Sequence, residues 1–467
     1  MLSKSDFLLF LEAPMHLWGK YHGGCQDKPP THFELFLSEQ GQAIESLAKT
    51  YLEDHILPVY EDAQLLWQQT FDDGRFQARA DAIIVDRVRG TYDLYEIKSS
   101  TSVRPTHKYD LSFQALLLKS QLNLRHVFLV HIQKDYHLGD GLNLRQFFII
   151  TDPTNEIIEL EQEVALLREE AHQLTQSQAL QPDLTCNNPK TCPCPALCHP
   201  NLPDHPIYDL PYIGKKATTL RGMGITAIKD IPESFNLNEK QEKHRSAIQL
   251  DKAIIDRDEI RQALSQCQYP LHFLDYETFN PAIPLFEGYH PYEPIVFQYS
   301  LFVLNKPNET PQHFECLLTG AEDPASKIVP NLLSRIGASG SVVVWNQSFE
   351  ASRNRELAKR TPQYADQLHD INDRMFDLMK IFKDGLYIHP DFHGSASLKA
   401  VLPVLCPELT YDSLAISDGG QAMLTWYALQ SGDIPIEDRE GVEQALRTYC
   451  RLDTWGMVQL WYKLRQI

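Results

Sequence analysis

Two acidic patterns that lie far apart in the chain place the strongest constraint on its fold. Residues 273–277 read Phe-Leu-Asp-Tyr-Glu, an apolar strand pattern that ends in Asp275 and Glu277. Because the side chains of a strand alternate between its faces, these two carboxylates point the same way. Tyr449 and Asp453 are four residues apart, which places a phenol and a carboxylate on one face of a helix. The two patterns predict a site for a hard divalent cation, in which Tyr449 positions a water molecule.

A third acid follows another apolar run between these two patterns. Residues 342–350 read Val-Val-Val-Trp-Asn-Gln-Ser-Phe-Glu, so Glu350 stands near the start of a helix that follows a strand. In order and spacing, residues 270–467 resemble an RNase H-like 3′-5′ exonuclease domain of the DEDD type, in its tyrosine-containing subtype. The resemblance implies that Tyr449 orients the attacking water and that two metal ions are held by four acids, Asp275, Glu277, Glu350 and Asp453.

Glu350 departs from the pattern of that family, in which an aspartate is usual at this place. The extra methylene moves the carboxylate by about 1.5 Å, the length of one carbon–carbon bond. Asp377, within the segment Arg-Met-Phe-Asp-Leu, is a further candidate acid. Taken singly, Asp-x-Glu and Tyr-x3-Asp are also common surface patterns, so the expectation depends on their combination.

The first half of the chain carries a second set of acids. Residues 79–85 and 92–100 are two strand patterns separated by an Arg-Gly turn, and together they predict a β-hairpin. Asp81 on the first strand then approaches Glu96 and Lys98 on the second, and the last two share one face. Two carboxylates bind Mg²⁺ or Mn²⁺, and an ammonium beside them stabilises charge on an attacked phosphate.

These residues resemble the PD-(D/E)XK core of RecB-family nucleases. Glu45 follows Gly41 at the start of an amphipathic helix, where that family has Gly-x3-His or Gly-x3-Glu, and the resemblance makes it a further metal ligand. Gln114, in the helix after the hairpin, matches the glutamine that contacts the active site in the family. The alternative for Gln114 is an ordinary solvent-facing side chain.

Four of the nine cysteines fall within residues 186–198. The apolar run at 7–11 is too short for a secretory signal and is flanked by acids, so a reducing, cytoplasmic location is expected. In that compartment clustered thiols indicate a metal site, and both zinc and an iron–sulfur cluster accept thiolate ligands. The predicted ligands are Cys186, Cys192, Cys194 and Cys198.

A resemblance favours iron–sulfur over zinc. Iron–sulfur RecB-like nucleases, including those associated with CRISPR, take three cysteines from just after the nuclease core and one from an N-terminal Cys-Pro pair. Here Ala13 precedes Pro14, so the N-terminal cysteine is missing. Cys194 or Cys25 is expected to replace it, and the alternative is that the cluster is lost and the site binds zinc.

The length of 467 residues exceeds what a single hydrophobic core normally serves, so two or three domains are expected. The predicted fold class is α/β, with a restriction-endonuclease-like (PD-(D/E)XK) domain at 1–200 and an RNase H-like domain with a mixed sheet at 270–467. A helical linker is expected at 201–269, and its residues 220–232 resemble a helix-hairpin-helix segment. No apolar stretch approaches the length that spans a bilayer, so no membrane partner is expected.

The net charge of -19 is unusual for a protein that binds nucleic acid, because phosphate binding normally depends on cations. Local patches such as Lys215, Lys216 and Arg221 can still supply that binding. The sequence therefore favours a Mg²⁺- or Mn²⁺-dependent nuclease with two active sites that acts on nucleic acid, with DNA preferred, in repair or defence. The alternative is a catalytically decayed nucleic-acid-binding or assembly module with a structural metal cluster.

Overall fold

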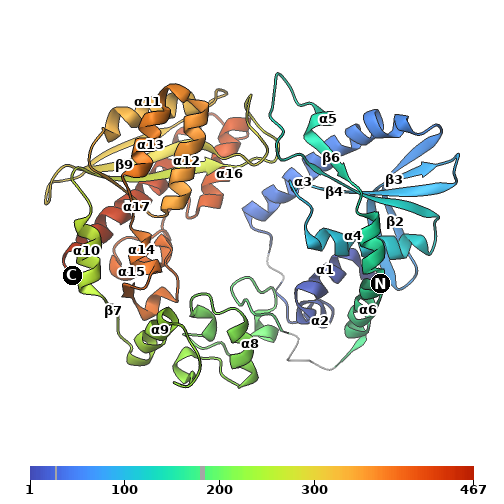
Figure 1. Cartoon of the computed structure of the whole chain (residues 1–467), viewed down its shortest axis with the longest axis horizontal. Helices are drawn as coiled ribbons and strands as arrows, with labels where there is room; N and C mark the ends of the chain where they lie inside the picture. Colours follow the sequence, from blue (N-terminus) through green and yellow to red (C-terminus); the bar gives the residue numbers. More distant parts are fainter. Residues whose placement is uncertain (27–28, 179–184) are drawn as a thin grey trace. The chain divides into compact units, whose positions relative to one another are not determined.

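The chain folds into two compact units. The computed structural model describes residues 1–26, 29–178 and 185–467 (Figure 1). The first unit is made of Met1–Asn201 and Pro281–Glu293, and the second of Leu202–Asn280 and Pro294–Ile467. Each unit has a mixed β-sheet with helices packed on it, so the α/β fold class with mixed sheets that the sequence predicts is confirmed.

Residues 202–269 of the expected helical linker lie in the second unit. Its strand β7 (Ile254–Ile255) pairs antiparallel with β13 (Tyr387–Ile388), far along the chain. Ladder hydrogen bonds of this kind tie the segment into a folded unit. Conversely, residues 281–293 leave the second unit and pack in the first.

Six strands form the sheet of the first unit. They are β1 (Leu2–Ser3), β2 (Ala63–Asp72), β3 (Phe76–Asp86), β4 (Thr91–Lys98), β5 (Leu124–Ile132) and β6 (Phe148–Thr151). Their order is β1-β3-β4-β5-β6, with β2 paired to β3. β3 and β4 are antiparallel and form the predicted hairpin, whereas β4 and β5 are parallel. The turn of the hairpin uses Gly90, whose φ of 63° favours glycine.

Helices cover both faces of this sheet. They are α1 (Lys4–Glu12), α2 (Pro14–His22), α3 (His32–Tyr51), α4 (Pro105–Lys119), α5 (Leu144–Phe147), α6 (Thr154–Gln176) and α7 (Pro195–Cys198). Consecutive residues of β3 show the two faces, since Ile83 packs with Leu111 of α4 and Ile84 packs with Ile44 of α3. Ala282, from the segment that returns to this unit, joins the α3 side. α4 and α6 lie side by side on the other side (Figure 1).

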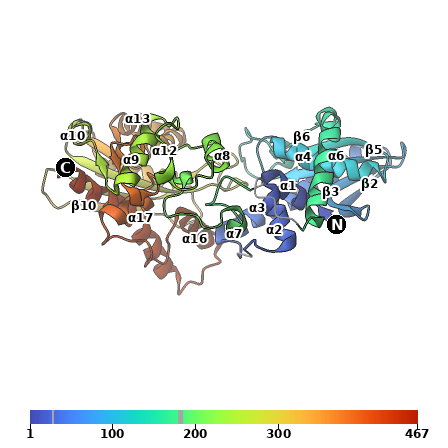
Figure 2. The same cartoon turned by 90° about the horizontal axis from the view of Figure 1, so that it is seen from below.

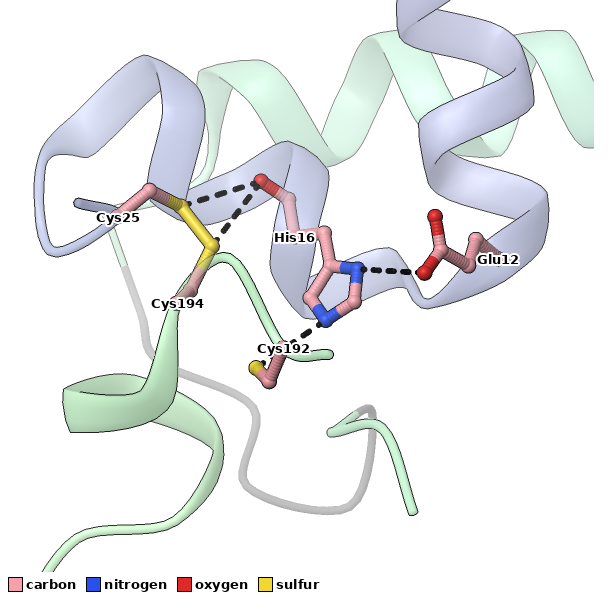
Figure 3. Close-up of a disulfide and its surroundings, with 5 residues drawn as sticks. All are labelled: Glu12, His16, Cys25, Cys192 and Cys194. Carbon is pink, nitrogen blue, oxygen red and sulfur yellow. Dashed lines mark hydrogen bonds and ion pairs between the residues drawn. A yellow bond between two sulfur atoms is a disulfide. The ribbon is translucent and has the colours of Figure 1, made fainter. Parts of the chain in front are cut away.

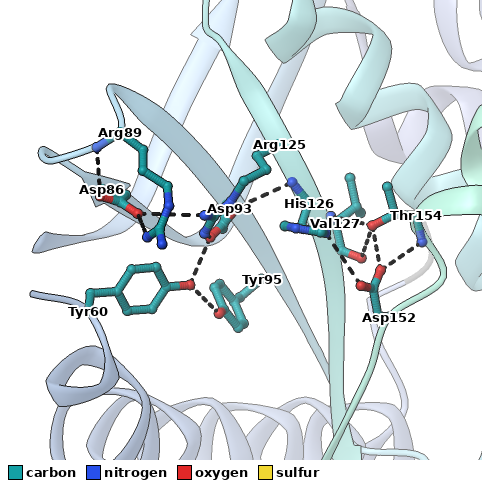
Figure 4. A network of polar contacts seen from close by, with 10 residues as sticks. All are labelled: Tyr60, Asp86, Arg89, Asp93, Tyr95, Arg125, His126, Val127, Asp152 and Thr154. Carbon is teal, nitrogen blue, oxygen red and sulfur yellow. Dashed lines mark hydrogen bonds and ion pairs between the residues drawn. The ribbon is translucent and has the colours of Figure 1, made fainter.

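A buried ion pair fixes the start of β4 (Figure 4). Asp93 is fully buried, and Nε of Arg125 on β5 donates to Asp93 Oδ1 at 3.0 Å. The Tyr60 hydroxyl donates to Asp93 Oδ2 at 2.8 Å, and the backbone N–H of His126 donates to Asp93 Oδ1 at 3.2 Å. Both carboxylate oxygens are thus satisfied beside a register shift in the β4–β5 pair. These contacts set where β4 presents Glu96.

Five strands form the main sheet of the second unit. They are β8 (Leu271–Phe279), β9 (Ile295–Leu304), β10 (Gln312–Leu317), β11 (Ser341–Val344) and β12 (Met375–Asp377). Their order is β10-β9-β8-β11-β12. β8, β9 and β10 are antiparallel neighbours, whereas β11 and β12 run parallel to β8. β8 is therefore the central strand, with hydrogen-bonded neighbours on both edges.

Helices pack on both faces of this second sheet (Figure 1, Figure 2). The helices of the unit are α8 (Lys215–Gly222), α9 (Glu239–Leu250), α10 (Arg257–Ser265), α11 (Ala325–Ile336), α12 (Gln347–Arg360), α13 (Ala365–Asp373), α14 (Met379–Lys383), α15 (Leu398–Leu405), α16 (Gly419–Ser431) and α17 (Arg439–Arg465). Leu274 and Tyr276 of β8 pack with α11 and α12, whereas Phe273 contacts Trp461 of α17 with ring centroids 6.2 Å apart. The alternation of β8 thus directs Asp275, with Phe273, to the α17 side.

Candidate active sites and metal centre

The central strand of the second unit presents two acids to α17. Asp275 and Glu277 share one side of β8, as residues two apart on a strand do. Ligand atoms of these two acids and of Cys450, on α17, lie within 4.8 Å of one another. Cys450 Sγ is 3.8 Å from Asp275 Oδ2. Glu277 is only 8% exposed, so water reaches the pair poorly.

Helix α17 adds Tyr449 and Asp453, which are buried and one helical turn apart. The hydroxyl of Tyr411 donates a hydrogen bond to Asp453 Oδ1. The Lys399 ammonium lies 5.4 Å from the ring centroids of both tyrosines and donates to the carbonyl oxygen of Ser417 at 2.8 Å. The Lys399 ammonium is therefore held beside the acidic site.

Glu350, in the first turn of α12, belongs to the same group. Its side chain is 3% exposed, and its Oε2 has no hydrogen-bond partner within the described ranges. Burial raises the pKa of Glu350 well above its usual range, and the charges of Asp275 and Glu277 raise it further. Charges affect one another this strongly only at short range inside a protein. The charges of Asp275 and Glu277 thus act on Glu350, although Glu350 is not one of the residues whose ligand atoms lie within 4.8 Å of one another.

The remaining acids also oppose one another's ionisation. Burial raises the pKa of Asp275 well above its usual range, and the charge of Asp453 adds to the effect. Burial does the same for Glu277, followed by the charges of Asp275 and Asp453. Burial raises the pKa of Asp453 to about 6, although the Tyr411 hydrogen bond and the charge of Lys399 lower it. Bound cations relieve this repulsion, and carboxylate oxygens are ligands that Mg²⁺ and Mn²⁺ prefer. The residues therefore fit the predicted metal.

Tyr411 and Gly419 also belong to this site and were not among the residues predicted. Tyr411 reaches Asp453 from the loop before α16, and Gly419 begins that helix. A Cβ on Gly419 would lie 3.9 Å from Tyr449 Oη and 4.0 Å from Glu277 Oε2, so glycine leaves open the space between phenol and acid. Neither residue has a sequence spacing that relates it to the acids.

Asp377, the further candidate acid, has a structural role. Its Oδ2 accepts the backbone N–H of Gln347 at 3.2 Å, and its Oδ1 accepts that of Met379 at 3.1 Å. Both oxygens thus cap backbone groups where α12 and α14 begin, which is a common use of aspartate.

In the first unit, the β3–β4 hairpin and α4 bring acids and amines together. Lys98 Nζ donates to Glu96 Oε1 and to Asp110 Oδ2, both at 2.7 Å. Gln114 Nε2 donates to Glu96 Oε2 at 2.8 Å and to Asp110 Oδ1 at 2.9 Å. Lys4, the first residue of α1, donates to Glu96 Oε1 at 2.6 Å. Gln114 is fully buried, so the solvent-facing alternative for this residue is wrong.

Asp81 completes this arrangement from β3, where its Oδ2 accepts the backbone N–H of Ile97 at 2.8 Å. Burial, followed by the charge of Glu96, raises the pKa of Asp81 to about 8. Burial alone would also raise the pKa of Glu96, but the charges of Lys98 and Lys4 lower it to about 2. A cavity of about 340 Å³ opens beside Asp81 and Lys4. The ammonium groups therefore stabilise the charged form of Glu96, whereas Asp81 would gain most from a metal ion.

Glu45 lies on α3, and its Oε2 accepts a hydrogen bond from Gln68 Nε2 at 3.2 Å. Gln68 is flanked on β2 by Trp67 and Gln69, which pair with Ala82 and Ala80 on either side of Asp81. Within the described ranges Glu45 has no hydrogen bond to the other acids. Lys4 and Asp110 were not predicted. Asp110 precedes Gln114 by one helical turn, a spacing that could have indicated it, whereas no pattern relates Lys4 to the hairpin.

A cluster of cysteines and a histidine forms a third site, also in the first unit. Ligand atoms of His16, Cys186, Cys192 and Cys198 all lie within 4.8 Å of one another. His16 Nε2 is 3.4 Å from Cys192 Sγ, and its Nδ1 is 3.7 Å from Glu12 Oε1 (Figure 3). Nδ1 has no hydrogen-bond partner among the described residues, so Glu12 acts on the ring as a nearby charge only. Burial lowers the pKa of His16 and so favours the neutral ring that a metal requires.

One predicted ligand of this centre, Cys194, lies outside the group of four ligand atoms. Cys194 is joined to Cys25 by a disulfide, so its sulfur is not part of the four-ligand group (Figure 3). A disulfide was not expected in a reducing compartment. His16 follows Ala13 by three residues and supplies the fourth ligand atom from the N-terminal element in which the related nucleases carry their cysteine. The sequence prediction missed this histidine because it sought a thiol.

Comparisons with known proteins match parts of the chain. Residues 272–397 match a family model described as "Domain of unknown function (DUF2779)". Over 206 residues the chain is 24% identical to "Uncharacterized protein MG366" of Mycoplasma genitalium, and over 206 residues it is 25% identical to the MG366 homolog of Mycoplasma pneumoniae. Each match covers 40% of this chain and 31% of the relative, so the chain spans about a third of the length of these relatives.

Two solved structures are similar to part of the chain. One is an alkaline exonuclease from Laribacter hongkongensis, at 15% identity and a TM-score of 0.25, covering 37% of this chain and 89% of that chain. The other is titled "Crystal structure of SSO0001", at 18% identity and a TM-score of 0.20. The match covers 35% of this chain and 75% of that chain. Similarity this low does not decide an activity. No helix in the described ranges combines the length and the apolar character that crossing a membrane requires.

Proposed function

We propose that this chain is a Mg²⁺- or Mn²⁺-dependent nuclease with two active sites, which hydrolyses phosphodiester bonds in nucleic acid, with DNA preferred, in repair or defence. One observation carries the proposal. The second unit carries four acids whose pKa values are all raised, the half-buried Asp275 and the buried Glu277, Glu350 and Asp453. Burying several carboxylates together is costly unless cations neutralise them. Strongly perturbed acids of this kind are typical of functional sites.

In the second unit, metal ions held by the four acids would activate water and stabilise charge on the attacked phosphate. Tyr449 lies one turn from Asp453, where its hydroxyl can orient the attacking water. Lys399, held beside the rings of Tyr411 and Tyr449, supplies a positive charge that attracts the phosphate backbone. These roles are those of a DEDD-type exonuclease of the tyrosine-containing subtype, so we infer digestion from the 3′ end.

In the first unit, Asp81 and Glu96 would hold the metal ion, with Glu45 as the further ligand. Gln114 donates to Glu96 and so fixes the direction in which this carboxylate points. Lys98 would stabilise charge on the attacked phosphate. Its ammonium has three N–H donors, of which Glu96 and Asp110 engage two. These are the roles of a PD-(D/E)XK nuclease.

The cysteine and histidine cluster is proposed as a structural metal centre. Three thiols and one imidazole match the Cys₃His class of structural zinc sites. Two zinc–sulfur bonds of about 2.3 Å span at most about 4.6 Å, which suits ligand atoms that lie within 4.8 Å of one another. We therefore propose zinc here, with the iron–sulfur cluster as the alternative. Metal analysis of anaerobically purified protein decides between them, because only the cluster brings iron, acid-labile sulfide and a brown colour.

One observation favours a second candidate function, a catalytically decayed nucleic-acid-binding module. Glu96 is already neutralised by the ammonium groups of Lys4 and Lys98, which compete with a metal ion for its oxygens. A first site that keeps this arrangement would bind a metal poorly. Binding of nucleic acid without metal-dependent cleavage would support this alternative.

The test is a cleavage assay with end-labelled single-stranded and double-stranded DNA and RNA, in Mg²⁺, Mn²⁺ or EDTA. Wild type is compared with Lys98→Ala, Asp275→Ala and the double variant, which disable the first site, the second site and both. We expect metal-dependent cleavage in wild type, partial activity in each single variant and none in the double variant. Undiminished cleavage by the double variant would show a contaminating nuclease, and no cleavage by wild type in either metal refutes the proposal.

A further inference from the structure

Away from these sites, two histidines and an aspartate converge in the second unit. Asp209 ends the 3₁₀ turn Ile207–Asp209, and His205 lies two residues before this turn. His393 directly follows the turn Pro390–Phe392. His393 Nδ1 lies 3.0 Å from Asp209 Oδ2, and the ring centroids of His205 and His393 are 5.2 Å apart. One ligand atom from each residue lies within 4.8 Å of the other two.

The backbone holds these two segments against each other. Gly394 has a φ of 69°, and a Cβ at this position would collide with the carbonyl oxygen of Asp209, so only glycine permits the approach. His393 itself has a left-handed backbone with a φ of 47°, which is uncommon for a residue other than glycine. On the other segment, Pro206 forms a β-bridge with Ala227. The backbone of both segments therefore holds the three side chains close together.

The donor atoms suit a borderline metal ion. Asp209 is 6% exposed, and Nδ1 of His205 is shielded from solvent and has no hydrogen-bond partner among the described residues. A buried polar atom without a partner costs free energy, and binding a ligand removes that cost. Two neutral imidazoles and one carboxylate are the donors of zinc sites that keep a fourth position for water.

The distances also agree with a single ion. Zinc bonds of about 2.0 to 2.1 Å to nitrogen and oxygen place two tetrahedral ligand atoms about 3.3 Å apart. The Nδ1 to Oδ2 distance of 3.0 Å between His393 and Asp209 is close to that value. Because His393 is half exposed, its ring can adjust without disturbing the core.

We propose that His205, Asp209 and His393 bind a zinc-like divalent transition metal ion. The ion would join the segment that begins the second unit to the loop that leads into α15. Lys399 stands in the first turn of α15, so the site would fix the loop from which this lysine reaches the acids. The proposed ion touches none of those acids, and the inference does not depend on nuclease activity.

The first test counts bound metal on the full chain. Protein stripped with a chelator is reloaded with Zn²⁺, separated from unbound metal and measured by elemental analysis. We expect His393→Ala to hold one equivalent of zinc fewer than wild type. The matched control is His369→Ala, which removes an exposed histidine of α13 and should leave the zinc content unchanged. Equal zinc content in wild type and His393→Ala would overturn the proposal.

The second test separates this site from the cysteine centre by using Co²⁺. Thiolate ligands give cobalt a strong sulfur-to-metal absorption in the near ultraviolet, whereas imidazole and carboxylate ligands give only weaker visible bands. The wild type minus His393→Ala difference spectrum should therefore show visible bands without the sulfur band. His205→Ala should remove the same bands, which keeps the test independent of buried Asp209. A flat difference spectrum would mean that the three residues form an ion pair and a ring stack only, and would refute the proposal.

Discussion

The two acidic sites of this chain accommodate buried carboxylates in opposite ways. In the first unit, Glu96 is paired with Lys98 and Lys4, whose charges outweigh burial and lower its pKa to about 2. In the second unit, Glu350 keeps an oxygen without a hydrogen bond among the described residues, and burial raises its pKa well above the usual range. The first site is largely neutralised by its own amines, whereas we expect the acids of the second to gain more from bound cations. Metal removal should therefore affect the second unit more strongly.

The largest expected effect is the loss of the second activity in Asp275→Ala. With the first site disabled by Lys98→Ala, we expect 3′-end digestion of a 5′-labelled strand to fall by about 1,000-fold, because the removed carboxylate serves the transition state through the metal. Asp275 also belongs to the group whose ligand atoms, with those of Glu277 and Cys450, lie within 4.8 Å of one another.

The matched control for this variant is Asp373→Ala, which removes an exposed aspartate at the end of α13. It should digest the strand at the rate of the Lys98→Ala parent. If Asp275→Ala digests the strand at the rate of the parent, Asp275 is not needed for catalysis. The contrast between the two acidic sites would then not explain the activity.

A smaller loss is expected for Tyr449→Phe. The ring packs near Tyr411 and below the Lys399 ammonium, so the fold and the metal ligands should remain. Only the hydroxyl that orients water is lost, and one such group contributes roughly 10- to 100-fold in rate. Single-turnover rates at saturating Mn²⁺ measure the effect. A rate equal to that of the parent would remove Tyr449 from the mechanism.

Asp453→Asn should stabilise the protein when no metal is present. The folded-state pKa of Asp453 is about 6, above an ordinary value of about 3.9, so the folded state binds this proton more tightly than the unfolded state. Stability from this group is therefore present below about pH 4 and lost as the pH rises through about 6. Asparagine cannot ionise, so it avoids this pH-dependent loss of stability. The loss amounts to at most about 3 kcal/mol in the free energy of unfolding.

Denaturant unfolding in EDTA at about pH 8 measures this difference, with Asp373→Asn as the control. In saturating Mn²⁺ the order should reverse, because only the wild type gains the full binding energy of the metal. If Asp453→Asn is less stable than wild type in EDTA, ionised Asp453 does not destabilise the metal-free protein.

Local periodicity explains which parts of both sites could be predicted from the sequence. The period of two on β8 brings Asp275 and Glu277 to one side, and the turn of α17 does the same for Tyr449 and Asp453. The β3–β4 hairpin follows from two strand patterns around Gly90. In each case the residues are close in sequence, so the geometry of one element is sufficient.

The residues that could not be predicted depend on contacts between distant segments. Lys4 meets Glu96 only because α1 packs beside the hairpin, and Cys25 is 169 residues from its partner Cys194. The return of residues 281–293 to the first unit also has no local pattern. Such pairings are set by the packing of whole elements, which single-sequence periodicity does not encode.

Lys4→Met sharpens the comparison by making the first site resemble the second. Methionine keeps the apolar stem of Lys4 but removes one ammonium from Glu96, which a metal ion can then bind with less competition. In an Asp275→Ala background, the Mn²⁺ concentration for half-maximal cleavage should fall by about tenfold. Lys20→Met, which removes an exposed partner of Asp6, is the control. An unchanged or higher Mn²⁺ requirement would show that Lys4 does not compete with the metal.

The smallest effect is expected for Glu350→Asp, which shortens the side chain by about 1.5 Å and restores the acid usual in DEDD-type domains. Glu350 already interacts electrostatically with Asp275 and Glu277, so it is placed to act as a ligand with its present length. We expect 3′-end digestion within about threefold of the Lys98→Ala parent, whereas Glu350→Gln should lose most of it. Glu356→Asp, on the same helix but paired with Arg353, is the control. A large gain of activity in Glu350→Asp would instead mean that the second site has drifted towards inactivity. The Glu350 oxygen without a hydrogen bond among the described residues would then be a sign of lost function and not a metal ligand.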